Sequence, residues 1–175
     1  MTIVITSGDP SGIGPEIVQK AWICLKKNPL NEFFWIGDPL HLPDSNIPWQ
    51  QIEHPDQASK VFGDALPILV HKFAHPIKVG QHQPENAADV IKVIKRAVGL
   101  VKTNKAKALC TSPINKNVLM SGANFPYTGH TEFLADLDAI DNPVMMLACS
   151  KLKVVPLTTH IPLKDVPDRI SKKLL

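Results

Sequence analysis

The sequence TIVITSGDPSGIGPE, residues 2–16, carries the signals of a strand, a tight turn and a helix in succession. Residues 2–7 form a short β-branched run, which predicts a buried strand. Residues 8–14 contain three glycines, which allow the backbone to turn sharply and to approach a ligand closely. Pro15 and Glu16 are typical of the first turn of a helix, because proline needs no amide partner there and an acid favours the positive end of the helix.

Strand-like and helix-like segments continue to alternate after this unit. Short apolar runs predict strands at residues 32–36, 66–70 and 106–111. Apolar side chains recur at helical spacing over residues 87–101, with basic side chains on the opposite face, which predicts an amphipathic helix. This alternation is typical of an α/β architecture with a largely parallel sheet.

The other segments carry weaker signals. Residues 38–60 are rich in proline, aspartate and asparagine, which predicts a loop with little regular structure. We expect helices at residues 131–140 and 166–175. Apolar runs at residues 144–149 and 152–158, separated by two polar residues, predict an antiparallel hairpin.

The composition is that of an ordinary globular protein and excludes several classes. The chain has 175 residues, 44% of them hydrophobic, and a formal net charge of +3 with no clustered basic face, so we expect no nucleic-acid partner. No apolar run approaches the roughly 20 residues of a membrane helix, so we expect no membrane partner. The three cysteines are widely spaced, which fits a reducing compartment, and we expect a cytoplasmic location.

Two motifs follow predicted strands, and each has two interpretations. The glycine turn at residues 7–16 can hold a ligand or can be a plain tight turn; it lacks the GxGxxG pattern of dinucleotide sites. The sequence TSPINK, residues 111–116, can bring Lys116 to an anionic group at the carboxyl end of a strand. It can also simply begin a helix, with Ser112 as the N-terminal cap.

Two further motifs contain histidine. The sequence YTGHTEF, residues 127–133, places His130 and Thr131 at a helix start, where an anion is favoured; a capping threonine beside a surface histidine is the alternative. His160 follows an apolar run and is a candidate metal ligand, although a lone histidine is more often structural. Metal binding needs about three protein ligands, so this residue alone is not sufficient.

These stretches, in this order, resemble one family. Five stretches are similar to those of the 4-hydroxythreonine-4-phosphate dehydrogenases: SGDPSGIGPE, TSPINK, FPYTGHTEFLA, VMMLACS and VVPLTTHIPLKDV. The resemblance implies an α/β fold like that of isocitrate and isopropylmalate dehydrogenases, which has two domains. Residues 1–125 would belong to the first domain, and residues 126–175 would begin a second, dimerising and metal-binding domain.

The resemblance also implies a reaction and its site. Family members oxidise 4-phosphohydroxy-L-threonine with NAD or NADP and decarboxylate it to 3-amino-2-oxopropyl phosphate, in pyridoxal 5'-phosphate synthesis. A divalent metal (zinc, magnesium or cobalt) is implied, with His160 as a ligand, at the interface of a homodimer. His130 and Thr131 are implied to hold the substrate. Lys116 and the glycine turn are candidates for the site lining, and the resemblance assigns no catalytic or cofactor-binding residue.

Family members extend well past Leu175, so we expect this chain to be the N-terminal half of such an enzyme and to be inactive alone. Two alternatives stay open. The substrate can be D-threonate or D-erythronate 4-phosphate, or the chain can be a non-catalytic remnant that binds a phosphorylated ligand or only dimerises.

Overall fold

A five-stranded parallel sheet forms the centre of the fold. The computed structural model describes residues 2–44, 46–159 and 161–172. The strands are β1 (Ile3–Thr6), β2 (Phe33–Ile36), β3 (Trp49–Gln51), β4 (Leu66–Ile68) and β5 (Ala108–Cys110), in the order β3-β4-β2-β1-β5. Every neighbouring pair in this sheet is parallel. The α/β class and the parallel sheet predicted from the sequence are therefore confirmed.

Helices connect the strands. They are α1 (Gly14–Leu25), α2 (Ala58–Val61), α3 (Ala87–Lys102), α4 (Lys116–Ala123), α5 (His130–Leu137) and α6 (Val166–Arg169). Short 3-10 turns lie at η1 (Pro29–Asn31), η2 (Pro39–His41), η3 (Pro55–Gln57), η4 (Pro84–Asn86) and η5 (Leu163–Asp165). The first four begin with proline, whose fixed φ angle suits the first position of a helical turn. Among the described residues, no helix is both long and apolar enough to cross a membrane.

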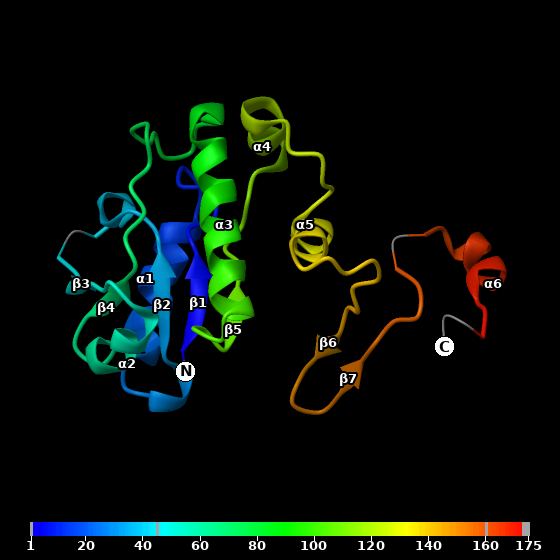
Figure 1. Cartoon of the computed structure of the whole chain (residues 1–175), viewed down its shortest axis with the longest axis horizontal. Coiled ribbons are helices and arrows are strands. Elements are labelled where there is room, and N and C mark those ends of the chain that lie inside the picture. The colour runs from blue at the N-terminus through cyan, green and yellow to red at the C-terminus, as the bar shows by residue number, and fades with distance from the viewer. Residues whose placement is uncertain (1, 45, 160, 173–175) are drawn as a thin grey trace.

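Alternate side chains of the central strands enter two separate cores. Val4 and Phe34 pack with Val93 of α3 on one face of the sheet. Trp35 packs with Trp22 of α1 on the other face, and Figure 1 shows α3 crossing the front of the sheet. Each fully buried large side chain stabilises the fold by roughly 1.5–3 kcal/mol relative to exposure. The strand period of two therefore produces a three-layer arrangement of helix, sheet and helix.

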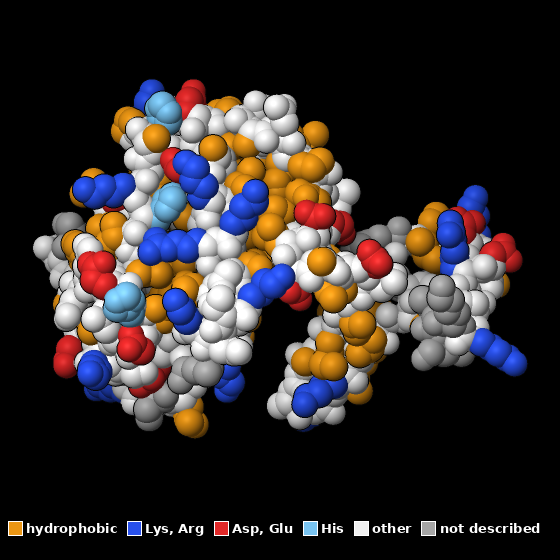
Figure 2. Space-filling model, viewed as in Figure 1, with side chains coloured by type: hydrophobic (Ala, Val, Ile, Leu, Met, Phe, Trp, Pro, Cys, Tyr) orange, Lys and Arg blue, Asp and Glu red, His pale blue; other side chains and the backbone are white. Residues whose placement is uncertain are grey.

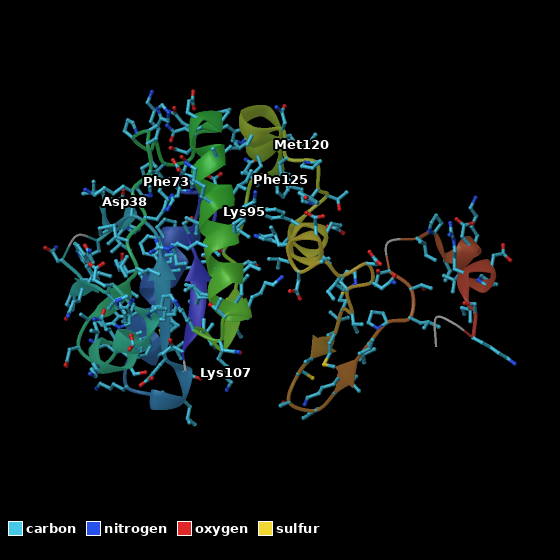
Figure 3. The ribbon with its side chains drawn as sticks, in the orientation of Figure 1. Asp38, Phe73, Lys95, Lys107, Met120 and Phe125 are labelled. Atoms are coloured by element: carbon cyan, nitrogen blue, oxygen red, sulfur yellow. The ribbon has the colours of Figure 1, made fainter. Side chains whose placement is uncertain are left out.

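A third core attaches the segment after β5 to the outer side of α3. Ile94 of α3 packs with Leu119 of α4 and with Phe133 of α5. Phe125, labelled in Figure 3, lies on the segment between α4 and α5. Its ring packs edge-on against that of Phe133, with ring centroids 5.0 Å apart. This core holds the start of α5 in a defined position, which matters because α5 carries two candidate site residues.

A small antiparallel hairpin lies beyond α5, as predicted. Its strands are β6 (Leu147–Ala148) and β7 (Lys153–Val154), and Figure 1 shows it standing away from the main sheet. Its apolar side chains are uncovered: Leu147 is 62% exposed and Leu152 is 63% exposed. Figure 2 shows hydrophobic side chains running along this segment.

The structure differs from the sequence-based expectation in two places. Residues 38–60, expected to be loop, contain η2, β3, η3 and most of α2. The helix expected at 166–175 is shorter, because α6 ends at Arg169 and Ile170 is extended.

Candidate functional site

The glycine turn links β1 to α1 through a set of local hydrogen bonds. Gly8 has a φ angle of +67°, in the left-handed region that glycine tolerates. The Asp9 carboxylate accepts a hydrogen bond from the backbone N–H of Ser11 at 3.0 Å, which closes the turn. Helix α1 then begins at Gly14, and its N-cap residue, Ile13, has no side chain that could accept a hydrogen bond. The N-cap side chain therefore accepts no hydrogen bond from the first N–H groups of α1.

The segment TSPINK packs directly against this turn. The backbone N–H of Asp9 donates to the Pro113 carbonyl oxygen at 2.8 Å, and that of Ser112 donates to the Thr6 hydroxyl at 3.1 Å. Helix α4 is capped by Asn115, whose side chain accepts from the N–H of Val118 at 3.2 Å. The interpretation of Ser112 as the helix cap is therefore wrong, because α4 begins only at Lys116 and its N-cap residue is Asn115.

A groove lies between the two motifs at the carboxyl ends of β1 and β5. It has a volume of about 570 Å³, and Asp9, Gly12 and Ile13 line it together with residues 113–117. Ligands of α/β proteins commonly bind at this end of a parallel sheet. The structure thus joins two motifs that lie far apart in the sequence.

Lys116 extends this groove toward the start of α5. Its Nζ atom lies 3.8 Å from the point that a Cβ atom on Gly129 would occupy. Gly129 is the N-cap residue of α5, and as a glycine it provides no side-chain cap for that helix. The Glu132 carboxylate oxygen Oε2 lies 3.6 Å from the same point, so groups of both charges stand beside the positive end of the α5 dipole.

His130 is half-buried beside Lys116. Burial, and secondarily the charge of Lys116, lower the pKa of His130 below its ordinary value. Its Nε2 atom is buried and has no hydrogen-bond partner among the described residues. A neutral imidazole with an unused nitrogen can donate to or accept from a ligand hydroxyl.

Thr131 faces a different hollow. It is exposed and lines a cavity of about 400 Å³ with Leu134, Ala135 and residues of the 138–145 segment. The structure brings His130 and Lys116 together but does not bring Thr131 to the groove between the glycine turn and TSPINK.

His160, the candidate metal ligand, lies outside the described residues. Among the residues that are described, no group of three His, Cys, Asp or Glu side chains is arranged to hold a metal ion. The described residues by themselves therefore do not fit a divalent metal.

Sequence reasoning did not find the contact between the two motifs or the approach of Lys116 to α5. The parallel pairing of β1 with β5 brings the two motifs to one edge of the sheet. No local pattern in the sequence indicates that these strands are neighbours.

Comparison with known proteins gives a consistent result. The family model described as pyridoxal phosphate biosynthetic protein PdxA matches residues 27–175. A 4-hydroxythreonine-4-phosphate dehydrogenase of Ruegeria sp. is 51% identical over 169 residues, covering 97% of this chain and 51% of the relative. One of Roseobacter denitrificans is 46% identical over 175 residues, covering 99% of this chain and 52% of the relative.

The fold agrees with these sequence matches. The crystal structure of a 4-hydroxythreonine-4-phosphate dehydrogenase from Burkholderia phymatum superposes with a TM-score of 0.89 at 31% identity, covering 99% of this chain and 54% of that one. The chain thus spans about half the length of the curated relatives that it matches.

Proposed function

Because this chain belongs to the PdxA family of pyridoxal phosphate biosynthetic proteins, we propose that it forms the N-terminal half of a 4-hydroxythreonine-4-phosphate dehydrogenase. The overall reaction oxidises the 3-hydroxyl of 4-phosphohydroxy-L-threonine with NAD or NADP as the hydride acceptor. The 1-carboxylate leaves as CO2, and the product is 3-amino-2-oxopropyl phosphate. The observation that carries the proposal is the approach of Lys116 to the start of α5, beside a half-buried His130 whose pKa is lowered.

The roles of this chain's residues follow from their charges and surroundings. The Lys116 ammonium and the first N–H groups of α5 attract an anionic group of the substrate. The Nε2 atom of His130, which has no partner among the described residues, hydrogen-bonds a substrate hydroxyl, because neutral imidazole can act as donor or acceptor. Thr131 supplies a further hydroxyl to the substrate once the second half of the protein closes the site.

We also propose a divalent metal (zinc, magnesium or cobalt), with His160 as one ligand and the other ligands from outside the described residues. When bound, such an ion polarises a substrate oxygen as a Lewis acid. His160 alone is too few ligands, so the chain by itself is expected to hold no metal and to form no reduced nicotinamide.

We propose a homodimer with the metal site at its interface. The uncovered apolar side chains of the β6–β7 hairpin support this, because exposed apolar surface is typical of association sites. We further propose the two-domain fold of the isocitrate dehydrogenases, with the first domain ending near Phe125. The three cysteines are free, which supports a cytoplasmic location.

A chimera tests the proposed activity. Joining this chain to the part of the Ruegeria relative that it does not cover would give a full-length protein. We expect the chimera to reduce NAD or NADP with 4-phosphohydroxy-L-threonine, and the His130→Ala and Lys116→Gln variants to lose most of that activity. Lys107→Gln, an exposed lysine at the opposite end of β5, is the matched control.

Two results decide between the alternatives. A folded, dimeric chimera that leaves the substrate unchanged, while the intact relative turns it over, would contradict the proposal. If the chimera turns over D-threonate or D-erythronate 4-phosphate faster than 4-phosphohydroxy-L-threonine, that sugar-acid phosphate is the substrate.

A separate variant tests the metal. His160→Ala in the chimera should lower the bound-metal content measured by mass spectrometry, and an unchanged content would exclude His160 as a ligand.

A further inference from the structure

A further cavity, separate from the groove and from the hollow at Thr131, lies between α3 and the segment that leads into α2. Its volume is about 570 Å³, equal to that of the groove at the glycine turn. None of the described residues that line it also lines that groove. This volume is within the range of sites for small ligands, roughly 300–1,000 Å³. The dehydrogenase proposal assigns no role to this cavity.

Buried apolar side chains form the floor of the cavity. Leu69, which is only 4% exposed, belongs to the core beneath α3, and Leu100 of α3 packs against the same core. Pro55 is also buried. Figure 2 shows hydrophobic side chains between α3 and the part of the molecule that contains α2, with charged side chains around them.

One wall of the cavity is cationic. Arg96 of α3 donates one hydrogen bond, from Nη1 to the Val70 carbonyl oxygen at 3.1 Å, and no carboxylate among the described residues forms an ion pair with it. Arg96 is exposed as a residue, but partial burial of its side chain lowers its pKa, against the opposing attraction of Glu53. None of the described carboxylates lies within ion-pair distance of its guanidinium. An anion bound here would satisfy its remaining donors.

Lys105 adds a second positive charge to this wall. It follows Asn104, which has a φ angle of +56° and turns the chain at the end of α3. The backbone N–H of Lys105 donates to the Leu100 carbonyl oxygen at 2.8 Å, which fixes the turn beside the cavity. Among the described residues the Lys105 ammonium has no ion-pair partner.

The other wall is acidic. Glu53 and Asp56 line the cavity from the segment before α2. The Glu53 carboxylate is held by a hydrogen bond from the Gln51 side chain at 2.6 Å. Within the described part of the chain, the Asp56 carboxylate has neither a hydrogen bond nor an ion pair, which leaves it available to a ligand.

We propose that this cavity binds a small zwitterion, with a phosphate or carboxylate group at Arg96 and Lys105 and an amine at Glu53 and Asp56. Two oppositely charged walls recognise a molecule that carries both charges, and they disfavour one that carries only a negative charge. The apolar floor accommodates a short carbon chain between the charged groups.

Backbone amide NMR of the chain tests this proposal with three probes. O-phosphoethanolamine and β-alanine carry both charges, whereas ethyl phosphate lacks the amine. We expect both zwitterions to shift the amide signals of Leu100 and Lys105, and ethyl phosphate to bind at least about tenfold more weakly. Signals at Gly129 and His130 report separately on the groove at α5, so binding there is not mistaken for binding at α3.

Variants complete the test. Arg96→Gln and, separately, Lys105→Gln should each weaken O-phosphoethanolamine binding about tenfold, whereas Lys95→Gln, on the same helix but outside the cavity lining, should not. Lys105 is exposed and its side chain makes no hydrogen bond to another described residue, so its variant is expected to fold even where Arg96→Gln does not. Absence of shifts at Leu100 and Lys105 with both zwitterions would refute the site, and equal binding of ethyl phosphate would refute the role of the acidic wall.

Discussion

The backbone N–H of Asp9 and the carbonyl oxygen of Pro113 form a 2.8 Å hydrogen bond that joins the first turn of the chain to the segment after β5. Gly8, immediately before Asp9, lies so close to this segment that a Cβ atom on it would be 2.5 Å from the same Pro113 oxygen. The shape of the groove therefore depends on a glycine at position 8.

Gly8→Ala should destabilise the protein by about 2 kcal/mol or more, because alanine is strained at a positive φ angle and its methyl group would collide with Pro113. Gly99→Ala is the matched control: Gly99 lies inside α3 with open space around it, so alanine should stabilise the helix by roughly 0.5–1 kcal/mol. Urea unfolding measures both changes. Equal midpoints for the two variants would contradict the account of the turn.

Lys116→Gln should raise the pKa of His130, because it removes the positive charge that disfavours protonation of the imidazole. The pKa should remain below its ordinary value, since burial, the larger cause, is unchanged. Titration of the imidazole proton signal by NMR gives the value directly. Lys107→Gln should leave the pKa of His130 unaltered. An equal rise of this pKa in both variants would show that Lys116 is not the charge that acts on His130.

His41 should make the protein less stable in mild acid. Burial, only partly opposed by the charge of Asp38, holds the pKa of His41 below its ordinary value of 6.5. The unfolded chain then binds a proton more readily than the folded chain, so the free energy of unfolding falls as the pH drops below about 6.5 and levels off under the folded-state pKa.

His71 and His130 shift in the same direction, so His41→Gln should reduce this pH dependence without abolishing it. Urea unfolding near neutral pH and in mild acid measures the difference. The exposed His82→Gln variant is the control. If His41→Gln leaves the pH dependence of the unfolding free energy unchanged, His41 has the same pKa in the folded and the unfolded chain.

Asp89→Asn should destabilise the loop that follows β4. The buried Asp89 carboxylate accepts hydrogen bonds from the Lys92 side chain at 2.9 Å and from the Ala74 N–H at 3.1 Å. Losing the charge on a buried acceptor costs about 1–3 kcal/mol. Thermal unfolding against the exposed Glu85→Gln variant checks this, and equal melting temperatures would show that the two bonds add no net stability.

The sequence predicts the helices and strands whose apolar residues form a clear pattern, and it misses those without such a pattern. Strands β1 and β2 and helices α1 and α3 were predicted, because each has an apolar pattern bounded by glycine or proline. Strand β3 was missed: its side chains are exposed and lie among prolines and polar residues, so no alternation marks it.

The candidate site was predicted as separate motifs rather than as a site. His130 and Lys116 were singled out, but their proximity depends on the third core, which no local pattern reveals. The cavity at Arg96 was not predicted at all. It is built from short pieces of several segments, each of which is unremarkable by itself.

The uncovered apolar side chains of the β6–β7 hairpin also govern how the chain behaves in solution. Water contact at these side chains is unfavourable, so dilution favours separate molecules and rising protein concentration drives them to assemble or precipitate. The yield of soluble material should therefore depend on whether another polypeptide is present during synthesis to shield the hairpin.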